Sequence, residues 1–155
     1  LGNGCRYCDG RVATADNNMT ITHPAIAREF HPTKNGSKRA SDYLTGTSVR
    51  LWWLCSRGHE WQTTGETRLG GAGCRYCAGR SAWPGWNDLA SQEPSIAAEW
   101  HPTRNGTLTP VDVTRGSGRS VWWQCSEGHE WQMVVHVRTY NRRGCSRCAR
   151  EERAA

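Results

Sequence analysis

The sequence predicts a small α+β protein, stabilised by metal ions and built from tandem repeats with short β-hairpins and short helices. Three observations lead to this fold class. A block of roughly 70 residues occurs twice, and in each copy three cysteines recur in the same order with a histidine four residues after the first of them. Leu, Ile, Val and Phe together make up only 19 of the 155 residues, although nine tryptophans are present. Small units with thin hydrophobic cores generally need a metal ion or disulfides to fold.

The repeat is clearest where residues 24–62 are laid over residues 94–132, because 20 of these 39 pairs are identical. One extra residue then enters the second copy before a shared Gly-Cys-x-x-Cys sequence. We therefore expect metal-binding repeats over residues 12–80 and 94–155, joined by a linker over residues 81–93.

The N-terminus contains a third fragment of the repeat. Residues 4–11 nearly duplicate residues 73–80, including the Cys-x-x-Cys pair at Cys5 and Cys8. We interpret residues 1–11 as the tail of a truncated upstream repeat. Cys5 and Cys8 are then a possible half-site, either as free thiols or as ligands shared with His23 or a neighbouring chain.

Each repeat is expected to begin with a short helix, over residues 24–30 and 94–100, because proline occupies the first turn. A His-Pro pair ends both helices, since a residue before proline disfavours the helical region. Asn-Gly pairs predict turns after the helices. Hydrophobic alternation and runs of tryptophan predict strands over residues 49–54, 121–124 and 131–138. The C-terminal residues 147–155 are expected to form a last helix.

The cysteines and histidines predict zinc sites. In each repeat a Cys-x3-His pair is followed, after 14 or 15 residues, by a Cys-x2-Cys pair. Thiolate and imidazole are the preferred zinc ligands, whereas a disulfide scaffold has no use for a histidine at a constant offset. A knuckle, a hairpin and a ligand pair that opens a helix describe a treble-clef or zinc-ribbon-like finger. The expected ligands are Cys55, His59, Cys74 and Cys77 in the first repeat and Cys125, His129, Cys145 and Cys148 in the second.

A competing register joins the pairs across repeats. It would combine Cys5/Cys8 with Cys55/His59, and Cys74/Cys77 with Cys125/His129. Its loops would be 46 and 47 residues long. Longer loops cost only about 1 kcal/mol more to close, so the stronger argument for the short loops is that they hold a hairpin.

The charge balance is compatible with a nucleic-acid partner. The formal net charge is +6, and arginine, which outnumbers lysine, suits bidentate contacts to phosphate and guanine. We expect the two fingers to bind nucleic acid, and DNA in particular, through the arginines that flank the zinc ligands, although a merely solvated basic face would have the same composition. These arginines are Arg68, Arg75, Arg80, Arg138, Arg142, Arg143 and Arg147.

Two other function classes remain open. A structural or protein-interaction module would use exposed tryptophans, and one residue of each Trp-Trp pair (52–53 and 122–123) must face away from the local core. An enzyme, such as a treble-clef nuclease, would need an open metal position, and four protein ligands leave none. His31 and His101 recur in His-Pro-Thr-x-Asn-Gly, which we interpret as a hydrogen-bonded turn rather than catalytic machinery. We therefore expect no enzymatic activity.

The sequence contains no apolar run long enough to span a bilayer and no secretory signal peptide. We therefore expect no membrane partner and a cytoplasmic location.

These motifs together resemble a known family. The pattern Glu-Trp-His-Pro-x-x-Asn-Gly, then Trp-Trp-x-Cys-x-x-Gly-His-Glu-Trp, then Gly-Cys-x-x-Cys is similar to the bacterial "probable zinc-ribbon domain" family, whose members are tandem treble-clef repeats of unknown function. The resemblance covers residues 24–80 and 94–150. The family's usual proline inside the last Cys-x2-Cys is replaced here by Arg75 and Ser146, which leaves the ligands unchanged. The resemblance implies a DNA-related role only by association with neighbouring nuclease domains in other members.

Overall fold

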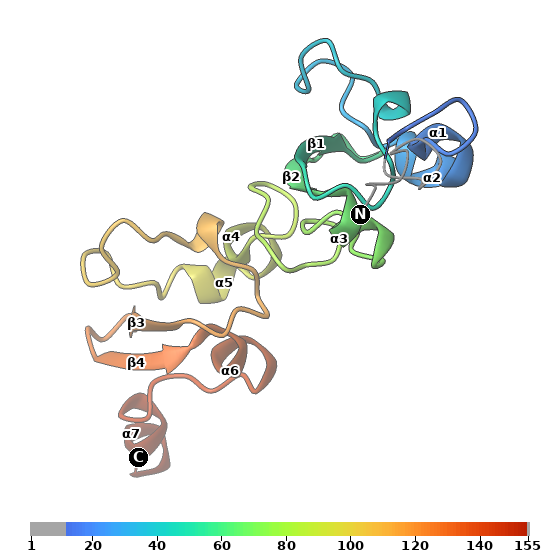
Figure 1. Cartoon of the computed structure of the whole chain (residues 1–155). Helices are drawn as coiled ribbons and strands as arrows, with labels where there is room; N and C mark the ends of the chain where they lie inside the picture. Colours follow the sequence, from blue (N-terminus) through green and yellow to red (C-terminus); the bar gives the residue numbers. More distant parts are fainter. Residues whose placement is uncertain (1–11, 155) are drawn as a thin grey trace, which may run out of the picture. The chain divides into compact units, whose positions relative to one another are not determined.

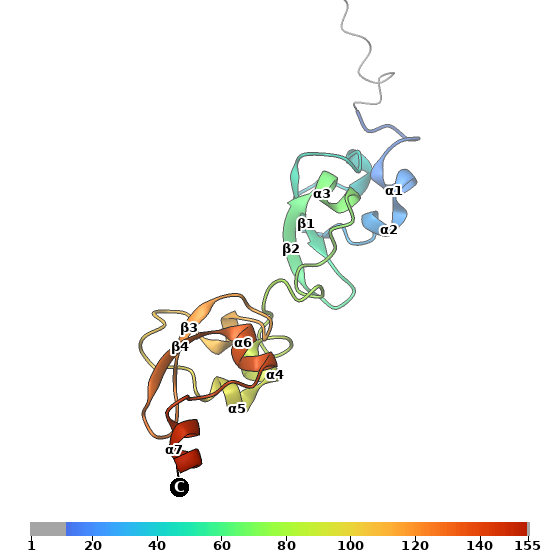
Figure 2. The ribbon, with the colours of Figure 1, turned by 90° about the horizontal axis from the view of Figure 1, so that it is seen from below.

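The computed structural model describes residues 12–154 and divides them into two compact units, whose boundary along the chain lies between Arg75 and Tyr76. Each unit contains a two-stranded antiparallel hairpin with short helices before and after it (Figures 1 and 2). The predicted half-site at Cys5 and Cys8 lies outside the described residues.

The first unit contains the expected leading helix and strand together with elements that the sequence did not predict. Two short helices and a 3-10 turn precede a hairpin, and a third helix follows it: α1 (Met19–Thr22), α2 (Pro24–Ala27), η1 (Ala40–Asp42), β1 (Arg50–Leu54), β2 (Glu60–Thr64) and α3 (Gly65–Leu69).

The second unit repeats this order and adds a C-terminal helix. Its elements are α4 (Leu89–Gln92), α5 (Pro94–Ala97), η2 (Pro110–Asp112), β3 (Ser120–Gln124), β4 (Glu130–Val134), α6 (Val135–Tyr140) and α7 (Cys148–Ala154). The strand predicted over residues 131–138 ends at Val134, because the following four residues begin α6. Val135 and Arg138 are both buried, three residues apart, as on one face of a helix, so the apparent alternation there was helical.

The segment predicted as a linker, residues 81–93, belongs to the second unit in the structure. Its second half forms α4, and Leu89 is completely buried in the core. Asp88 begins this helix, since its carboxylate accepts hydrogen bonds from the Ser91 N–H at 2.9 Å and the Gly85 N–H at 2.6 Å. Burial opposes ionisation of Asp88, but the hydrogen bonds from Ser91 and Gly85 hold its pKa below the usual value. The repeat therefore starts earlier than its identical residues suggested.

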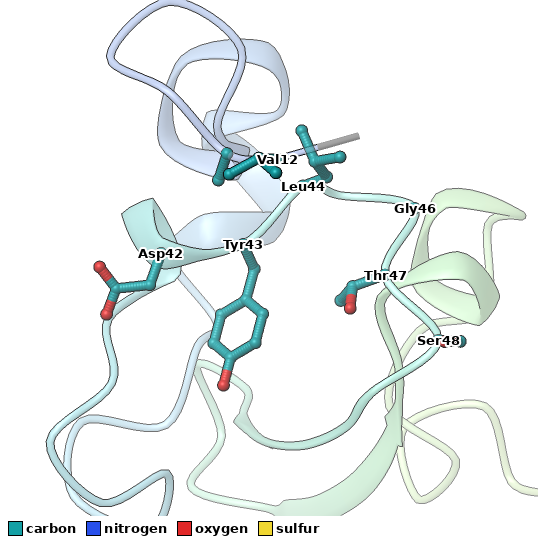
Figure 3. A pocket seen from close by; sticks show the side chains of 8 residues that line it. Val12, Asp42, Tyr43, Leu44, Gly46, Thr47 and Ser48 are labelled. Carbon is teal, nitrogen blue, oxygen red and sulfur yellow. The ribbon is translucent and has the colours of Figure 1, made fainter. Parts of the chain in front are cut away.

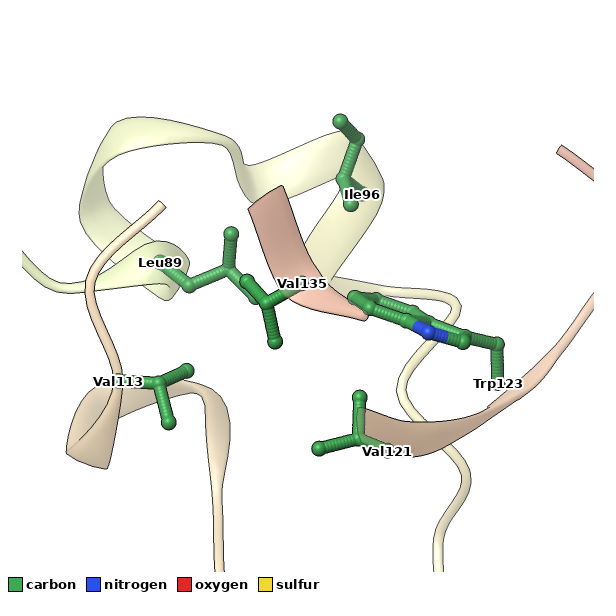
Figure 4. Close-up of a cluster of buried hydrophobic side chains, with 6 residues drawn as sticks. All are labelled: Leu89, Ile96, Val113, Val121, Trp123 and Val135. Carbon is green, nitrogen blue, oxygen red and sulfur yellow. The ribbon is translucent and has the colours of Figure 1, made fainter. Parts of the chain in front are cut away.

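The core of the second unit gathers side chains from helices, loop and hairpin around one tryptophan (Figure 4). Trp123 is completely buried, and its indole N–H donates to the Met133 carbonyl at 3.0 Å. The cluster consists of Leu89, Ile96, Val113, Val121, Trp123 and Val135. In the first unit Trp53 takes the same position and donates to the Thr63 carbonyl.

The two cores differ by a compensating exchange of size. Val113 and Val135 of the second unit correspond to Tyr43 and Gly65 of the first. A Cβ at Gly65 would lie 2.3 Å from the Thr45 carbonyl oxygen, so this position accepts no side chain in the first unit. At these two aligned positions the first unit has one larger and one smaller residue, Tyr43 and Gly65, where the second unit has two valines.

The His-Pro-Thr-x-Asn-Gly motif extends each hairpin on its free side. In the first unit the Leu54 N–H donates to the Glu29 carbonyl at 2.7 Å, and the His31 N–H donates to the Trp52 carbonyl at 3.0 Å. The Asn35 side chain accepts from the Trp52 N–H at 2.8 Å and donates to the Trp52 carbonyl at 3.0 Å. The second unit has the same contacts through Asn105. The motif thus acts as a short third strand against the tryptophan pair.

The histidine of this motif is part of the turn. His31 Nδ1 accepts hydrogen bonds from the backbone N–H groups of Thr33 at 3.3 Å and Lys34 at 3.1 Å. The ring proton must then reside on Nε2, which donates to Glu60 at 2.8 Å. Hydrogen bonds from Lys34 and His31 lower the pKa of Glu60 below its usual value. His101 makes the same contacts with Glu130, so the hydrogen-bonded turn expected from the sequence is present in both units.

Candidate metal centres

The first metal centre begins in the turn between β1 and β2. The Cys55 N–H donates to the His59 carbonyl at 3.1 Å, and the Gly58 N–H donates to the Cys55 carbonyl at 2.9 Å. Gly58 has a φ of +80°, which favours glycine. Cys74 and Cys77 follow α3 and complete the cluster, with all four ligand atoms within 4.8 Å of one another. His59 Nδ1 lies 3.5 Å from Cys74 Sγ.

The second metal centre repeats this arrangement between the turn after β3 and the first residue of α7, Cys148. His129 Nδ1 lies 3.4 Å from Cys148 Sγ and 3.5 Å from Cys145 Sγ. Cys125 Sγ lies 3.6 Å from Cys148 Sγ. The four ligand atoms again lie within 4.8 Å of one another.

These separations fit a tetrahedral zinc ion. Zinc–sulfur bonds of about 2.3 Å and zinc–nitrogen bonds of about 2.0 Å place two sulfurs about 3.8 Å apart and a sulfur and a nitrogen about 3.5 Å apart. The chain thus forms two Cys3His zinc-binding sites, and in each of them Nδ1 is the histidine nitrogen that lies among the cysteine sulfurs. Four protein ligands close each site, which is the arrangement of structural zinc.

The pairing of ligands confirms the short-loop register. Each cluster takes its four ligands from one repeat, and the cross-repeat combination of Cys74/Cys77 with Cys125/His129 does not occur. None of the six described cysteines forms a disulfide.

The thiols of the second centre have unequal proton affinities when no metal is bound. Burial opposes ionisation of Cys145, but backbone N–H groups of Cys148 and Arg147 outweigh it and lower the pKa of Cys145 to about 7. Burial and the neighbouring sulfurs of Cys125 and Cys145 raise the pKa of Cys148 to about 12. Zinc must therefore displace a proton from Cys148 when it binds.

Two of the seven arginines expected on the nucleic-acid surface are inside the units. Arg68 and Arg138 are only 7% and 8% exposed. Arg68 forms an ion pair with Glu29 and lies over the Trp53 ring, 5.1 Å from its centroid. Arg138 donates twice to Glu99, at 2.9 and 2.7 Å. Their recurrence in both repeats therefore reflects a structural ion pair, and they are not available to phosphates.

The other five predicted arginines are exposed. They stand beside the last two ligands of each centre: Arg75, Arg80, Arg142, Arg143 and Arg147. Arg142 forms an ion pair with Glu93 at 3.0 Å and has a φ of +51°, at a position where the first unit has Gly71.

The outward face of each hairpin carries one member of the Trp-Trp pair. Trp52 is the member of its pair that faces away from the core, whereas Trp53 is completely buried. The Lys34 ammonium lies over the Trp52 ring, 4.7 Å from its centroid. In the second unit the Arg104 guanidinium lies 4.2 Å from the centroid of Trp122. Each hairpin therefore presents a tryptophan with a cation stacked on it.

The first unit also has a cavity of about 710 Å³ beside η1 (Figure 3). It is lined by Val12, Tyr43, Leu44 and neighbouring backbone, with Asp42 as its acidic group. Asp42 accepts a hydrogen bond from the Arg39 N–H at 2.9 Å, which holds the 3-10 turn in place. Among the described residues, its titratable lining groups are Asp42 and Tyr43.

The fold and the two centres define a class of protein, the tandem treble-clef zinc fingers. The chain belongs to the family described as "Probable Treble clef zinc finger domain", which it matches twice, over residues 26–80 and 96–151. No curated protein matches the chain. Among the described residues, none of the helices combines the length and the apolar character that a membrane span requires.

The ligand turn offers a first test of the metal centres. We expect Gly128→Ala to destabilise the zinc-loaded second unit by about 1–2 kcal/mol, because Gly128 has a φ of +77°, which alanine rarely adopts. A Cβ at this position would meet no atom within 4 Å, so no steric clash adds to the effect. The cost is therefore purely conformational. Chemical denaturation of the zinc-loaded protein would measure it. Gly118→Ala, at a glycine without positive φ and with open space around it, should change the stability by much less, and equal effects of the two variants would contradict the interpretation.

Proposed function

We propose that this protein is a nucleic-acid-binding module, with DNA as its principal ligand, in which zinc holds the fold and the bound polymer contacts exposed arginines. The observation that carries this proposal is the exposure of five arginines directly beside the two metal centres. Guanidinium groups at a rigid, metal-bound turn suit phosphate recognition, since their positions cost little entropy to maintain. We propose no enzymatic activity, because both centres have their full set of protein ligands.

The charge distribution supports the proposal and indicates which repeat contributes most. Residues 12–80 contain nine Lys and Arg against five Asp and Glu, a net charge of +4. Residues 81–155 contain nine against eight, a net charge of +1. Non-specific attraction to a phosphate backbone depends on this balance, so we expect the first repeat to supply more of it.

The proposal predicts binding that weakens steeply with salt. A fluorescently labelled 20-base-pair DNA duplex should bind at low ionic strength, with log K falling linearly against log salt. Substituting Arg75→Ala together with Arg80→Ala should make this slope shallower by about 1–2, because each lost phosphate contact removes about 0.9. Fluorescence anisotropy across a salt series would measure it.

The matched control is Arg28→Ala, which removes an exposed positive charge outside the predicted surface. It should leave the slope nearly unchanged. If neither duplex nor single-stranded DNA binds at low salt, the proposal is wrong. If Arg28→Ala and the paired substitution of Arg75 and Arg80 change the slope of log K against log salt equally per charge removed, DNA is attracted by the net charge alone. In that case the assignment of Arg75 and Arg80 to the binding surface is wrong.

A protein-binding role is the second candidate, and one observation favours it. The exposed arginines do not recur between the repeats, since Arg75 and Arg80 align with Ser146 and Glu151. The outward tryptophans Trp52 and Trp122 do recur, each with its stacked cation. A half-buried tryptophan beside a cation is typical of interface anchors. Purification of the full chain with a partner protein but without nucleic acid would support this alternative.

A further inference from the structure

The second unit contains a cavity of about 470 Å³ that the metal centres do not use. It is lined by residues at the two ends of α4, in the loop before β3 and at the end of α6, and by Ala78 and Gly79, which follow Cys77. Its volume is within the usual range for small-ligand sites. Its distinctive side chains are Trp86, Gln92, Arg115 and Tyr140.

Two aromatic rings and one guanidinium group give this cavity its character. Tyr140 is 60% exposed, although it is a large aromatic residue at a helix end. The Arg115 guanidinium lies over its ring, 5.7 Å from the centroid. A Cβ at Gly116 would lie 3.2 Å from the Tyr140 hydroxyl, so glycine gives the ring room at this wall. The cavity therefore combines π-faces with a positive charge at its rim.

The fold does not require these residues, because the first unit is built without them. Helix α6 has six residues and α3 has five, and the C-cap residues that follow them are Asn141 and Gly70, which makes Tyr140 the inserted residue of the second repeat. Arg115 and Trp86 correspond to Thr45 and Asp16. Thr45 is buried and hydrogen-bonded to His23 at 2.9 Å, so the first unit has no cation at this position. Residues that one repeat lacks without losing its fold are candidates for a ligand-binding role.

The polar groups of the cavity complement a nucleobase. The Gln92 side chain donates to the Trp86 carbonyl at 2.6 Å, which turns its amide plane against the cavity wall. Its carbonyl oxygen has no donor among the described residues and can accept from an N–H of a base. Aromatic faces stack with every base, and arginine pairs with phosphate. A nucleotide is the ligand that uses all three kinds of group at once.

From this combination we infer that the cavity takes one unstacked base of a single-stranded nucleic acid, together with its phosphate. Tyr140 provides the stacking face, Gln92 accepts a base N–H, and Arg115 contacts the phosphate. A base paired in a duplex is not accessible to such a cavity, so the site distinguishes single strands from duplexes. The inference rests on the proposed function and adds to it a preference for single strands over duplexes.

The test compares Tyr140→Ala and Arg115→Ala with the unchanged chain, all loaded with zinc. The probes are a labelled 12-nucleotide single strand and a hairpin duplex of the same sequence, measured by fluorescence anisotropy at low salt. We expect the single strand to bind at least several-fold more tightly than the duplex to the unchanged protein. Tyr140→Ala should weaken single-strand binding by about 5- to 100-fold, since loss of one stacked base commonly costs that much, and should leave duplex binding within twofold.

Tyr140→Phe is the matched control, because it retains the ring and should retain single-strand binding. Zinc content and thermal unfolding show whether each variant is folded, and the exposure of Tyr140 makes this the expected result. Equal losses for single strand and duplex, or no loss in Tyr140→Ala, would overturn the inference while leaving the proposed function in place. Absence of binding to either probe would instead overturn the proposed function, and the inference with it. The inference would also be overturned if Tyr140→Ala abolished binding of a protein partner and left single-strand binding unchanged.

Discussion

Cys125→Ser should reduce the zinc content from two ions to one per chain and unfold the second repeat, residues 94–155, while the first repeat, residues 12–80, keeps its metal. The structure places Cys125 Sγ 3.6 Å from Cys148 Sγ, within one closed cluster. A serine hydroxyl does not ionise at neutral pH, so the site loses a strong ligand. Zinc binding to small fingers supplies roughly 10–16 kcal/mol of apparent free energy, which is as large as the whole stability of an ordinary domain. Elemental analysis and two-dimensional NMR would measure the two effects.

Cys55→Ser is the reciprocal variant and should unfold the first repeat while the second repeat keeps its zinc. The two variants together test the ligand register, because each cluster takes its ligands from one repeat. A zinc count of two in either variant, or loss of both ions in one of them, would contradict the assigned ligand sets. An excess of chelator should unfold both units of the unchanged protein.

Arg138→Ala should destabilise the zinc-loaded second unit by about 2–4 kcal/mol. Its side chain is 9% exposed and donates two hydrogen bonds to Glu99, so its removal leaves a half-buried carboxylate without its partner. Loss of one partner from a fully buried pair costs about 3–5 kcal/mol, and the 29% exposure of Glu99 reduces that figure. Chemical denaturation monitored by tryptophan fluorescence would measure the change.

The control for this prediction is Arg143→Ala, an exposed arginine a few residues further on, which should change stability by less than about 0.5 kcal/mol. Glu99→Leu combined with Arg138→Met should recover much of the lost stability, because an apolar pair leaves no charge unpaired. If Arg138→Ala unfolds like the unchanged protein but binds DNA more weakly, the arginine belongs to the binding surface and the structural interpretation is wrong.

Features that depend on local spacing could be predicted from the sequence. A Cys-x3-His turn, a spacer of 14 or 15 residues and a Cys-x2-Cys turn bring four ligands together with little help from the rest of the chain. The hairpin expected within the spacer was wrong, because the Cys-x3-His turn itself joins the two strands and the spacer continues from the second strand into a helix. The hairpins followed from the tryptophan-rich runs, and Trp53 and Trp123 proved to be the buried members of their pairs. The repeat made these predictions stronger, because each was made twice.

Features that depend on distant partners could not be predicted in this way. Arg68 pairs with Glu29 from a segment 39 residues away, so its sequence neighbours gave no sign that it is buried. The boundary at residues 81–93 was missed because Asn87 and Asp88 resemble a loop, while Leu89 is recognised as core only when its packing is seen. The alternation after Trp131 fitted a strand, although its second half follows a helical period.

The sequence by itself determined the repeat, the metal and its eight ligands, since these follow from residue types at short, constant spacings. Only the tertiary structure decided which arginines face the solvent, where the second unit begins, and that Trp86, Arg115 and Tyr140 line one cavity. The reason is physical: burial and ion pairing depend on contacts between segments that are far apart along the chain, and one added residue in α6 is enough to place an aromatic ring at such a meeting point.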